Sequence, residues 1–94
     1  MIKYTKHFLN KLEDFLKKQE YIIRYEKGNF HSGYCLVEST KVVVINKFFD
    51  TEGRINNIIE IILQVQLDEA LLDTKDKDLL KHLIHTWENV NTEI

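Results

Sequence analysis

Two apolar runs separated by two polar residues constrain the fold more than any other feature of this sequence. Residues 33–38 and 41–47 flank Ser39-Thr40 and predict a β-hairpin. A two-residue turn there pairs Glu38 with Lys41, Val37 with Val42, Leu36 with Val43, and Cys35 with Val44. Both faces of this hairpin are apolar. Because a sheet with one wet face alternates hydrophobic and polar residues, we expect helices on both sides, or a partner subunit, to cover it.

The segments around the hairpin predict one more strand and three helices. Residues 21–26 are rich in β-branched and aromatic side chains, which favours a strand. Residues 5–19, with Thr5 as N-cap, and residues 74–88 carry apolar side chains at helical spacing. The middle helix of the three, from Asp50 or Thr51 to about residue 66, is apolar almost all round. This pattern predicts a place in the core or in an interface. The expected fold is α+β, in the order α-β-β-β-α-α, with a three-stranded antiparallel sheet packed with helices.

Length and composition indicate one soluble domain. The 94 residues contain no proline and three glycines, so no linker divides them, and residues 89–94 are expected to form a frayed tail. A net charge of −2 gives no general attraction to nucleic acid or to anionic membranes. The single cysteine fits a reducing compartment. With no signal-peptide pattern and no apolar run of about 20 residues, we expect a cytoplasmic protein without a membrane anchor.

Three side chains are the candidates for catalysis. Glu60 lies among isoleucines, where a carboxyl group with a raised pKa could act as a general base. Cys35 and His31 could act as a nucleophile and its base, although no third, orienting group is evident. The competing interpretation makes Glu60 part of a narrow polar helix side and Cys35 a small core residue, and we favour it for both.

Residues 25–35 gather aromatic, basic and hydrogen-bonding side chains in one hairpin region. This mixture makes five residues the candidates for ligand binding: Tyr25, Lys27, Phe30, His31 and Tyr34. The alternative is that the aromatic rings only close one end of the core. His82 and His85 lie three residues apart on the last helix, but no third ligand has suitable spacing, so we expect no metal site and no cofactor.

A local resemblance suggests a fold. Residues 32–62 resemble the minimal zinc peptidases that cleave phage-type repressors: Val-Val-Val-Ile-Asn at 42–46 is similar to their strand, and residues 54–63 align without gaps with their active-site helix, Arg-Phe-Thr-x-x-His-Glu-x-x-His. Glu60 falls on the catalytic glutamate, whereas Ile59 and Leu63 occupy the histidine positions. The resemblance therefore implies a metal-free, zincin-like fold, because the glutamate of those enzymes acts on zinc-bound water.

The whole chain also resembles a group of small bacterial proteins without an assigned activity. The similar runs are residues 25–30 and 44–49. This second resemblance implies no chemistry.

These observations favour a non-enzymatic binding or scaffold domain that acts as a homodimer or with a protein partner. The alternative is an enzyme, such as a degenerate zincin-like hydrolase, that uses Glu60 with Cys35 and His31. A third hypothesis, the least favoured, is single-stranded nucleic-acid binding. Its basic residues would be Arg24, Lys27, Lys41 and Lys47.

Overall fold

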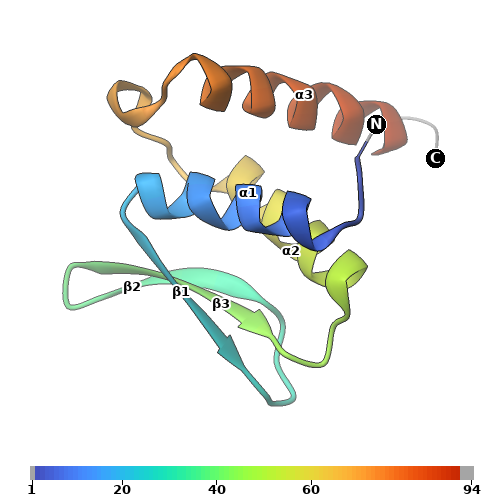
Figure 1. Ribbon diagram of the computed structural model, residues 1–94. Helices are drawn as coiled ribbons and strands as arrows, with labels where there is room; N and C mark the ends of the chain where they lie inside the picture. Colours follow the sequence, from blue (N-terminus) through green and yellow to red (C-terminus); the bar gives the residue numbers. More distant parts are fainter. Residues whose placement is uncertain (1, 92–94) are drawn as a thin grey trace.

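The computed structural model describes residues 2–91, and side chains up to residue 87. The elements follow the order α-β-β-β-α-α, with one short 3-10 turn before the last helix (Figure 1). Their bounds are α1 Lys6–Lys18, β1 Tyr21–Glu26, β2 Gly33–Val37, β3 Thr40–Asn46, α2 Thr51–Gln64, η1 Glu69–Leu71 and α3 Thr74–Asn91. The predicted α+β class and element order are confirmed.

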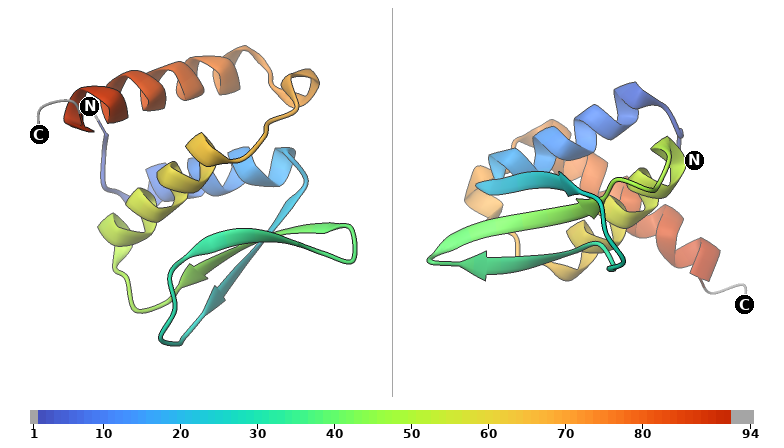
Figure 2. Two further views of the ribbon diagram at one scale, coloured as in Figure 1. Left: turned by 180° about the vertical axis from the view of Figure 1, so that it is seen from behind. Right: turned by 90° about the horizontal axis from the view of Figure 1, so that it is seen from below.

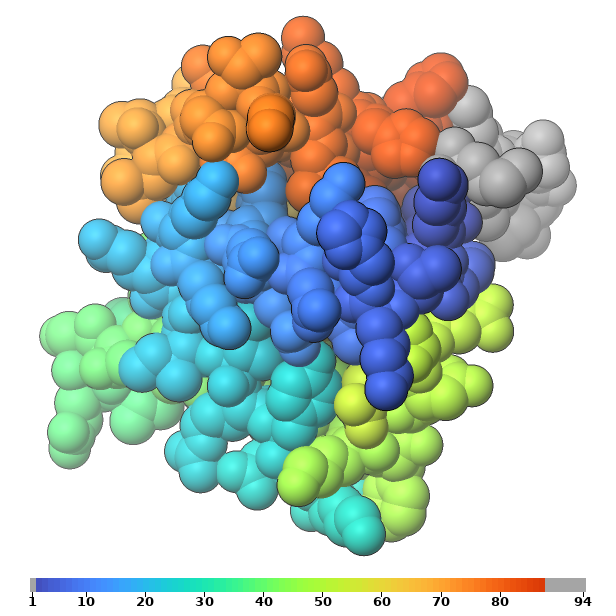
Figure 3. All heavy atoms as spheres, viewed as in Figure 1, coloured from blue at the N-terminus to red at the C-terminus, as the bar shows by residue number. Residues whose placement is uncertain are grey.

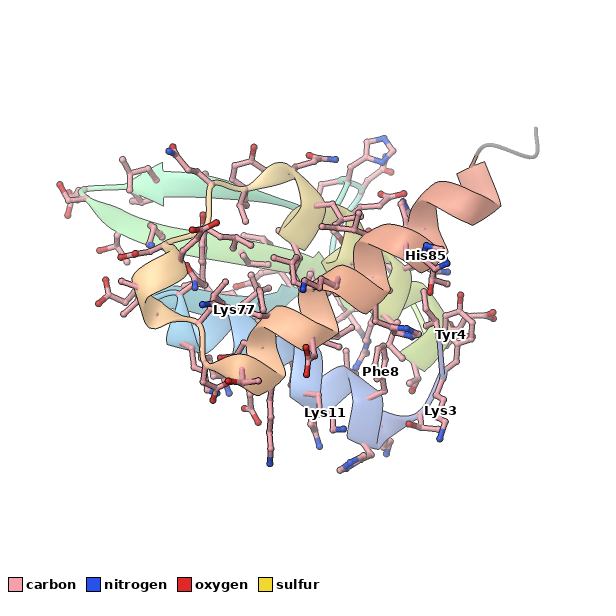
Figure 4. All side chains as sticks on the ribbon, turned by 90° about the horizontal axis from the view of Figure 1, so that it is seen from above. Lys3, Tyr4, Phe8, Lys11, Lys77 and His85 are labelled. Atoms are coloured by element: carbon pink, nitrogen blue, oxygen red, sulfur yellow. The ribbon has the colours of Figure 1, made fainter. Side chains whose placement is uncertain are left out.

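The elements form three layers. The sheet lies on one side, α1 and α2 pack on one of its faces, and α3 lies beyond them (Figures 1 and 2). Side chains fill the space between the layers, as the space-filling view in Figure 3 shows. Seen from the α3 side, the last helix crosses over the other two, with the strands beneath (Figure 4). In the part of the chain that the structure describes, all three α-helices therefore lie on the same side of the sheet.

The sheet is mixed, whereas we expected it to be antiparallel throughout. Its strand order is β1-β3-β2, with β1 parallel and β2 antiparallel to β3. The expectation assumed that strands adjacent in the sequence pair with each other. Instead β3 takes the centre because it carries four consecutive apolar residues, 42–45, of which Val43 and Ile45 are fully buried.

The hairpin turn lies one residue earlier than the sequence suggested. Glu38 and Ser39 form the turn, with φ of 49° and 69°, and positive φ at both positions is what a type I′ turn requires. The resulting register pairs Gly33 with Val44, Tyr34 with Val43, Cys35 with Val42, Leu36 with Lys41, and Val37 with Thr40. Each β2 residue therefore pairs with the β3 residue two positions before its predicted partner. Because side chains alternate between the faces with a period of two, every side chain keeps its predicted face.

The core forms between the sheet and the helices. The Thr5 hydroxyl accepts a hydrogen bond from Phe8 N and caps α1, as predicted, and Asp50 caps α2 by accepting one from Gly53 N. One face of α1 is buried. Five isoleucines of α2 are buried in the core as well: Ile55, Ile58, Ile59, Ile61 and Ile62. The almost all-round apolar α2 thus takes the core position, one of its two predicted places, because it lies between the sheet and α3.

Two remaining expectations concern the ends of the chain and the membrane. Residues 89–91 of the expected tail belong to α3, and residues 92–94 lie outside the described residues. None of the helices in the described part of the chain combines the length and apolar character that a bilayer crossing requires.

Candidate functional site

Among the described residues, 2–91, no helix lies against one face of the sheet. Partners in the register point to the same side, so Ile22, Val42 and Cys35 face away from the buried Val43 and form the middle of this outer face. Ile22 and Val37 are 52% and 53% exposed. The view from below in Figure 2 shows the sheet with all the helices behind it. We call this surface, which comprises Ile22, Arg24, Cys35, Val37, Val42 and Val44, the outer face.

The edge strand β2 is exposed on both of its faces. Tyr34 and Leu36 point to the helix side, like Val43, yet they are 46% and 69% exposed on this edge strand. Four consecutive residues of this edge, 34–37, are therefore exposed, and none of them is charged. Sequence reasoning missed this edge. The sequence feature that could have indicated this edge is the uncharged run 34–37, because the more apolar strand at 42–45 is the better candidate for the centre of the sheet.

Cys35 is exposed, which contradicts the prediction that it is a small core residue. The prediction correctly placed it on the apolar face that includes Val37. That face, however, is not covered by any helix of residues 2–91, because these helices pack on the opposite side of the sheet. The thiol is therefore accessible from the open side of the sheet.

The structure does not bring the three catalytic candidates together. Glu60 is exposed on α2, which lies on the helix side of the sheet, while Cys35 points to the outer face. His31 is exposed in the loop before β2. The helix positions that the zincin resemblance assigns to zinc ligands are Ile59, which is fully buried, and Leu63, which is half-buried against the core.

The loop of residues 27–32 is held by one buried side chain, Asn46 at the end of β3. Its Nδ2 donates to the carbonyl oxygens of Gly28 and Phe30, both at 2.9 Å, and its Oδ1 accepts from Phe48 N at 3.1 Å. Its backbone N–H donates to Ser32 Oγ at 2.9 Å. The predicted ligand residues Lys27 and Phe30 are exposed on this loop. No sequence signal distinguished Asn46, since its partners are backbone groups brought close by the fold.

Tyr25, another predicted ligand residue, is half-buried and contacts side chains of the same chain. Its hydroxyl donates a hydrogen bond to Glu13 on α1, and the Arg54 guanidinium lies 5.0 Å from its ring centroid. Burial, followed by the Glu13 interaction, raises the pKa of Tyr25 well above its usual value of 10.0. Tyr34 is separate from this cluster, on the exposed edge strand.

An apolar hollow lies elsewhere, between the end of α2 and α3. It measures about 470 Å³ and is lined by Ile62, Leu63, Val65, Leu67, Glu69, Leu72, Leu80 and Ile84. None of the predicted site residues lines it. Within residues 2–87, His, Cys, Asp and Glu side chains form no group of three or more that could hold a metal ion.

The comparisons with known proteins give no relative for this chain. No protein-family model, no curated protein and no solved structure matches it. The fold and the exposed surface define only a class: a small α+β domain whose mixed sheet is covered on one face. The two resemblances drawn from the sequence stay predictions.

Proposed function

We propose that this domain is a non-enzymatic binding or scaffold module that assembles as a homodimer through its β-sheet. The observation that carries the proposal is a set of exposed apolar side chains on the sheet: Ile22 of β1 and Tyr34, Leu36 and Val37 of β2. Transfer of apolar surface out of water contributes about 25 cal/mol per Å². A second copy of the chain at the sheet would bury part of this surface, either on the outer face or at the open β2 edge.

The enzyme alternative has less support. It needs Glu60 close to Cys35 and His31 around one pocket, and Glu60 and Cys35 leave the fold on opposite sides of the sheet. Nucleic-acid binding has less support for a similar reason. Arg24 points to the outer face, where it pairs with Glu26 at 2.9 Å, whereas the Lys41 ammonium lies 4.8 Å from the Tyr21 ring centroid on the helix side. A strand of nucleic acid could not contact both cations on one face.

A cytoplasmic location belongs to the same proposal. Cys35 is exposed as a free thiol, and such thiols persist in reducing compartments.

The test is the mass of the untagged protein in solution at tens of micromolar, by native mass spectrometry and by light scattering. We expect twice the 11.2 kDa of one chain and no bound metal. A strictly monomeric species would contradict the homodimer. Retention on a single-stranded oligonucleotide at low salt, lost as salt is raised, would favour the nucleic-acid alternative instead.

A further inference from the structure

We propose that two copies of this chain join edge to edge through β2, in the antiparallel register that places Cys35 opposite Cys35 of the second copy. This inference rests on the proposed homodimer and specifies its interface. The two three-stranded sheets would become one six-stranded sheet, with β2 and its copy at the centre and the helices of both copies on one side.

The free backbone groups of β2 are in the right places for this pairing. Antiparallel ladders alternate between hydrogen-bonded and non-hydrogen-bonded pairs. Since a two-residue turn follows Val37, the pair Val37–Thr40 is hydrogen-bonded, as are the pairs of Cys35 and Gly33. Tyr34 and Leu36 therefore direct their N–H and C=O groups to the open edge of the sheet.

The two edges of the sheet differ in their protection. Monomeric proteins blunt an exposed edge with charges, proline or a bulge. The β1 edge carries the Arg24–Glu26 ion pair. Between Gly33 and Val37 the β2 edge has no charged residue and no proline. The sequence thus protects one edge and leaves the other open for a strand.

The strand is complementary to itself in one register. Full overlap of two five-residue β2 strands, related by a two-fold axis through the sheet, opposes Tyr34 to Leu36 of the second copy and Gly33 to Val37. Tyr34 and Leu36, the two exposed helix-side residues of β2, then cover each other. An aromatic ring opposite an aliphatic chain is a stabilising cross-strand pair. This complementarity selects a second copy of the chain as the occupant.

Charge supports the same register. Glu38 is the first charged residue beyond β2 on the turn side. In the fully overlapped register it lies opposite Ser32 of the second copy, and the two Glu38 residues are about 20 Å apart, six residues along the ladder. A slide of the strands that opposed the two turns would bring these carboxylates together and expose the apolar pairs again.

The register makes a direct chemical prediction, because Cys35 would occupy a non-hydrogen-bonded pair with its own copy. The Cα atoms of such a pair lie about 4.5 Å apart, within the range of about 4.4–6.8 Å that a disulfide requires. Diamide, which accepts two electrons and two protons from two thiols, should therefore convert the dimer into a disulfide-linked species. Denaturing, non-reducing electrophoresis measures it.

The matched control moves the thiol by two residues on the same face. In the double variant Cys35→Ser, Val37→Cys, the introduced thiol at position 37 lies opposite Gly33 of the second copy. The two introduced thiols are then about 13 Å apart along the ladder, too far for a disulfide. This variant should dimerise like the wild type but give no disulfide-linked species. Equal cross-linking of both proteins would overturn the register.

A second pair of variants separates the edge from the outer face. Leu36→Lys places a charge at the centre of the proposed ladder and should yield monomers by native mass spectrometry, with unchanged circular dichroism because the side chain is 69% exposed. Ile22→Lys, on the outer face of the opposite edge, should remain dimeric. The reverse result would overturn the edge inference and keep the homodimer. A monomeric wild type would overturn both proposals, even if a foreign peptide bound the free edge.

Discussion

Gln19 and Asp68 exchange two hydrogen bonds across 49 residues of sequence. Gln19 Nε2 donates to the Asp68 carbonyl oxygen at 3.1 Å, and Asp68 N donates to Gln19 Oε1 at 2.7 Å. Gln19 is fully buried at the C-cap of α1. Its side-chain amide satisfies the backbone N–H and C=O groups of Asp68, in the segment that follows α2. The contact therefore connects the end of α1 to the connection that leads to α3.

Replacing Gln19 should destabilise the protein through these backbone groups. Gln19→Leu keeps the approximate volume but leaves Asp68 N–H and C=O without their partners, which costs about 1–3 kcal/mol. The measurement is the midpoint of urea unfolding, compared between proteins whose dependence of unfolding free energy on urea concentration has the same slope. Gln66→Leu, at an exposed position, is the control and should leave the midpoint unchanged. Equal midpoints for the two variants would mean that water replaces Gln19 without cost.

Replacing Asn46 should also lower the free energy of unfolding. Asn46→Asp is isosteric, but a carboxylate oxygen would face the carbonyl oxygens of Gly28 and Phe30 where the amide now donates. Because Asn46 is buried, we expect a loss of about 3 kcal/mol in unfolding free energy and faster amide hydrogen exchange across residues 27–32.

The control for Asn46 lies in the loop that it holds. Asn29→Asp introduces the same charge at an exposed position, so stability should change by less than about 0.5 kcal/mol. Similar losses for both variants would assign the effect to the added negative charge and not to the lost amide donor.

The fold class and the element order could be predicted because local patterns carry them. Thr5 and the apolar stripe of α1 specify a capped amphipathic helix regardless of the rest of the chain. The strand order could not be predicted in the same way. Parallel pairing of β1 with β3 depends on which strand lies at the centre of the sheet. β3 lies there with Val43 and Ile45 fully buried, and this burial depends on contacts with distant segments that a local sequence pattern does not show.

The candidate surface was predictable only in part. The apolar character of both hairpin faces was evident from the alternation around Val37 and Val42, and it led to the expectation of cover on both sides. Which face would be left open depended on how α1 and α2 pack, so the burial of Cys35 was predicted wrongly. Asn46 could not be found at all, because its partners are backbone groups up to 18 residues away.

Asp73 makes stability depend on acid pH. Asp76 N donates to Asp73 Oδ1 at 2.8 Å, and this hydrogen bond, with the Lys18 ammonium at 3.3 Å, lowers the pKa of Asp73 below 3.8. A lowered folded-state pKa contributes stability above the unfolded value, which is lost as pH falls through the folded value. Asp73→Asn should therefore flatten the decline of Tm between about pH 5 and pH 2.

The readout for this prediction is the fluorescence of Trp87, the single tryptophan, which lies on α3 and packs against the core. Asp78→Asn removes an equal charge from an exposed position of α3 and should keep the wild-type pH profile. Parallel profiles for the wild type and Asp73→Asn would show that the Lys18 and Asp76 contacts do not favour the charged carboxylate.

Tyr25 makes stability depend on alkaline pH, with the opposite sign. Burial and then the hydrogen bond to Glu13 raise its pKa above the unfolded value of 10.0, so its contribution is fully present below that value and is lost as pH rises toward the folded pKa. In a native-state absorbance titration at 295 nm, Tyr25→Phe should remove a tyrosine that ionises later than a free one. Glu13→Gln removes the carboxylate while keeping an acceptor oxygen, and should bring that ionisation to lower pH. If Glu13→Gln left the curve unchanged, burial alone would account for the raised pKa.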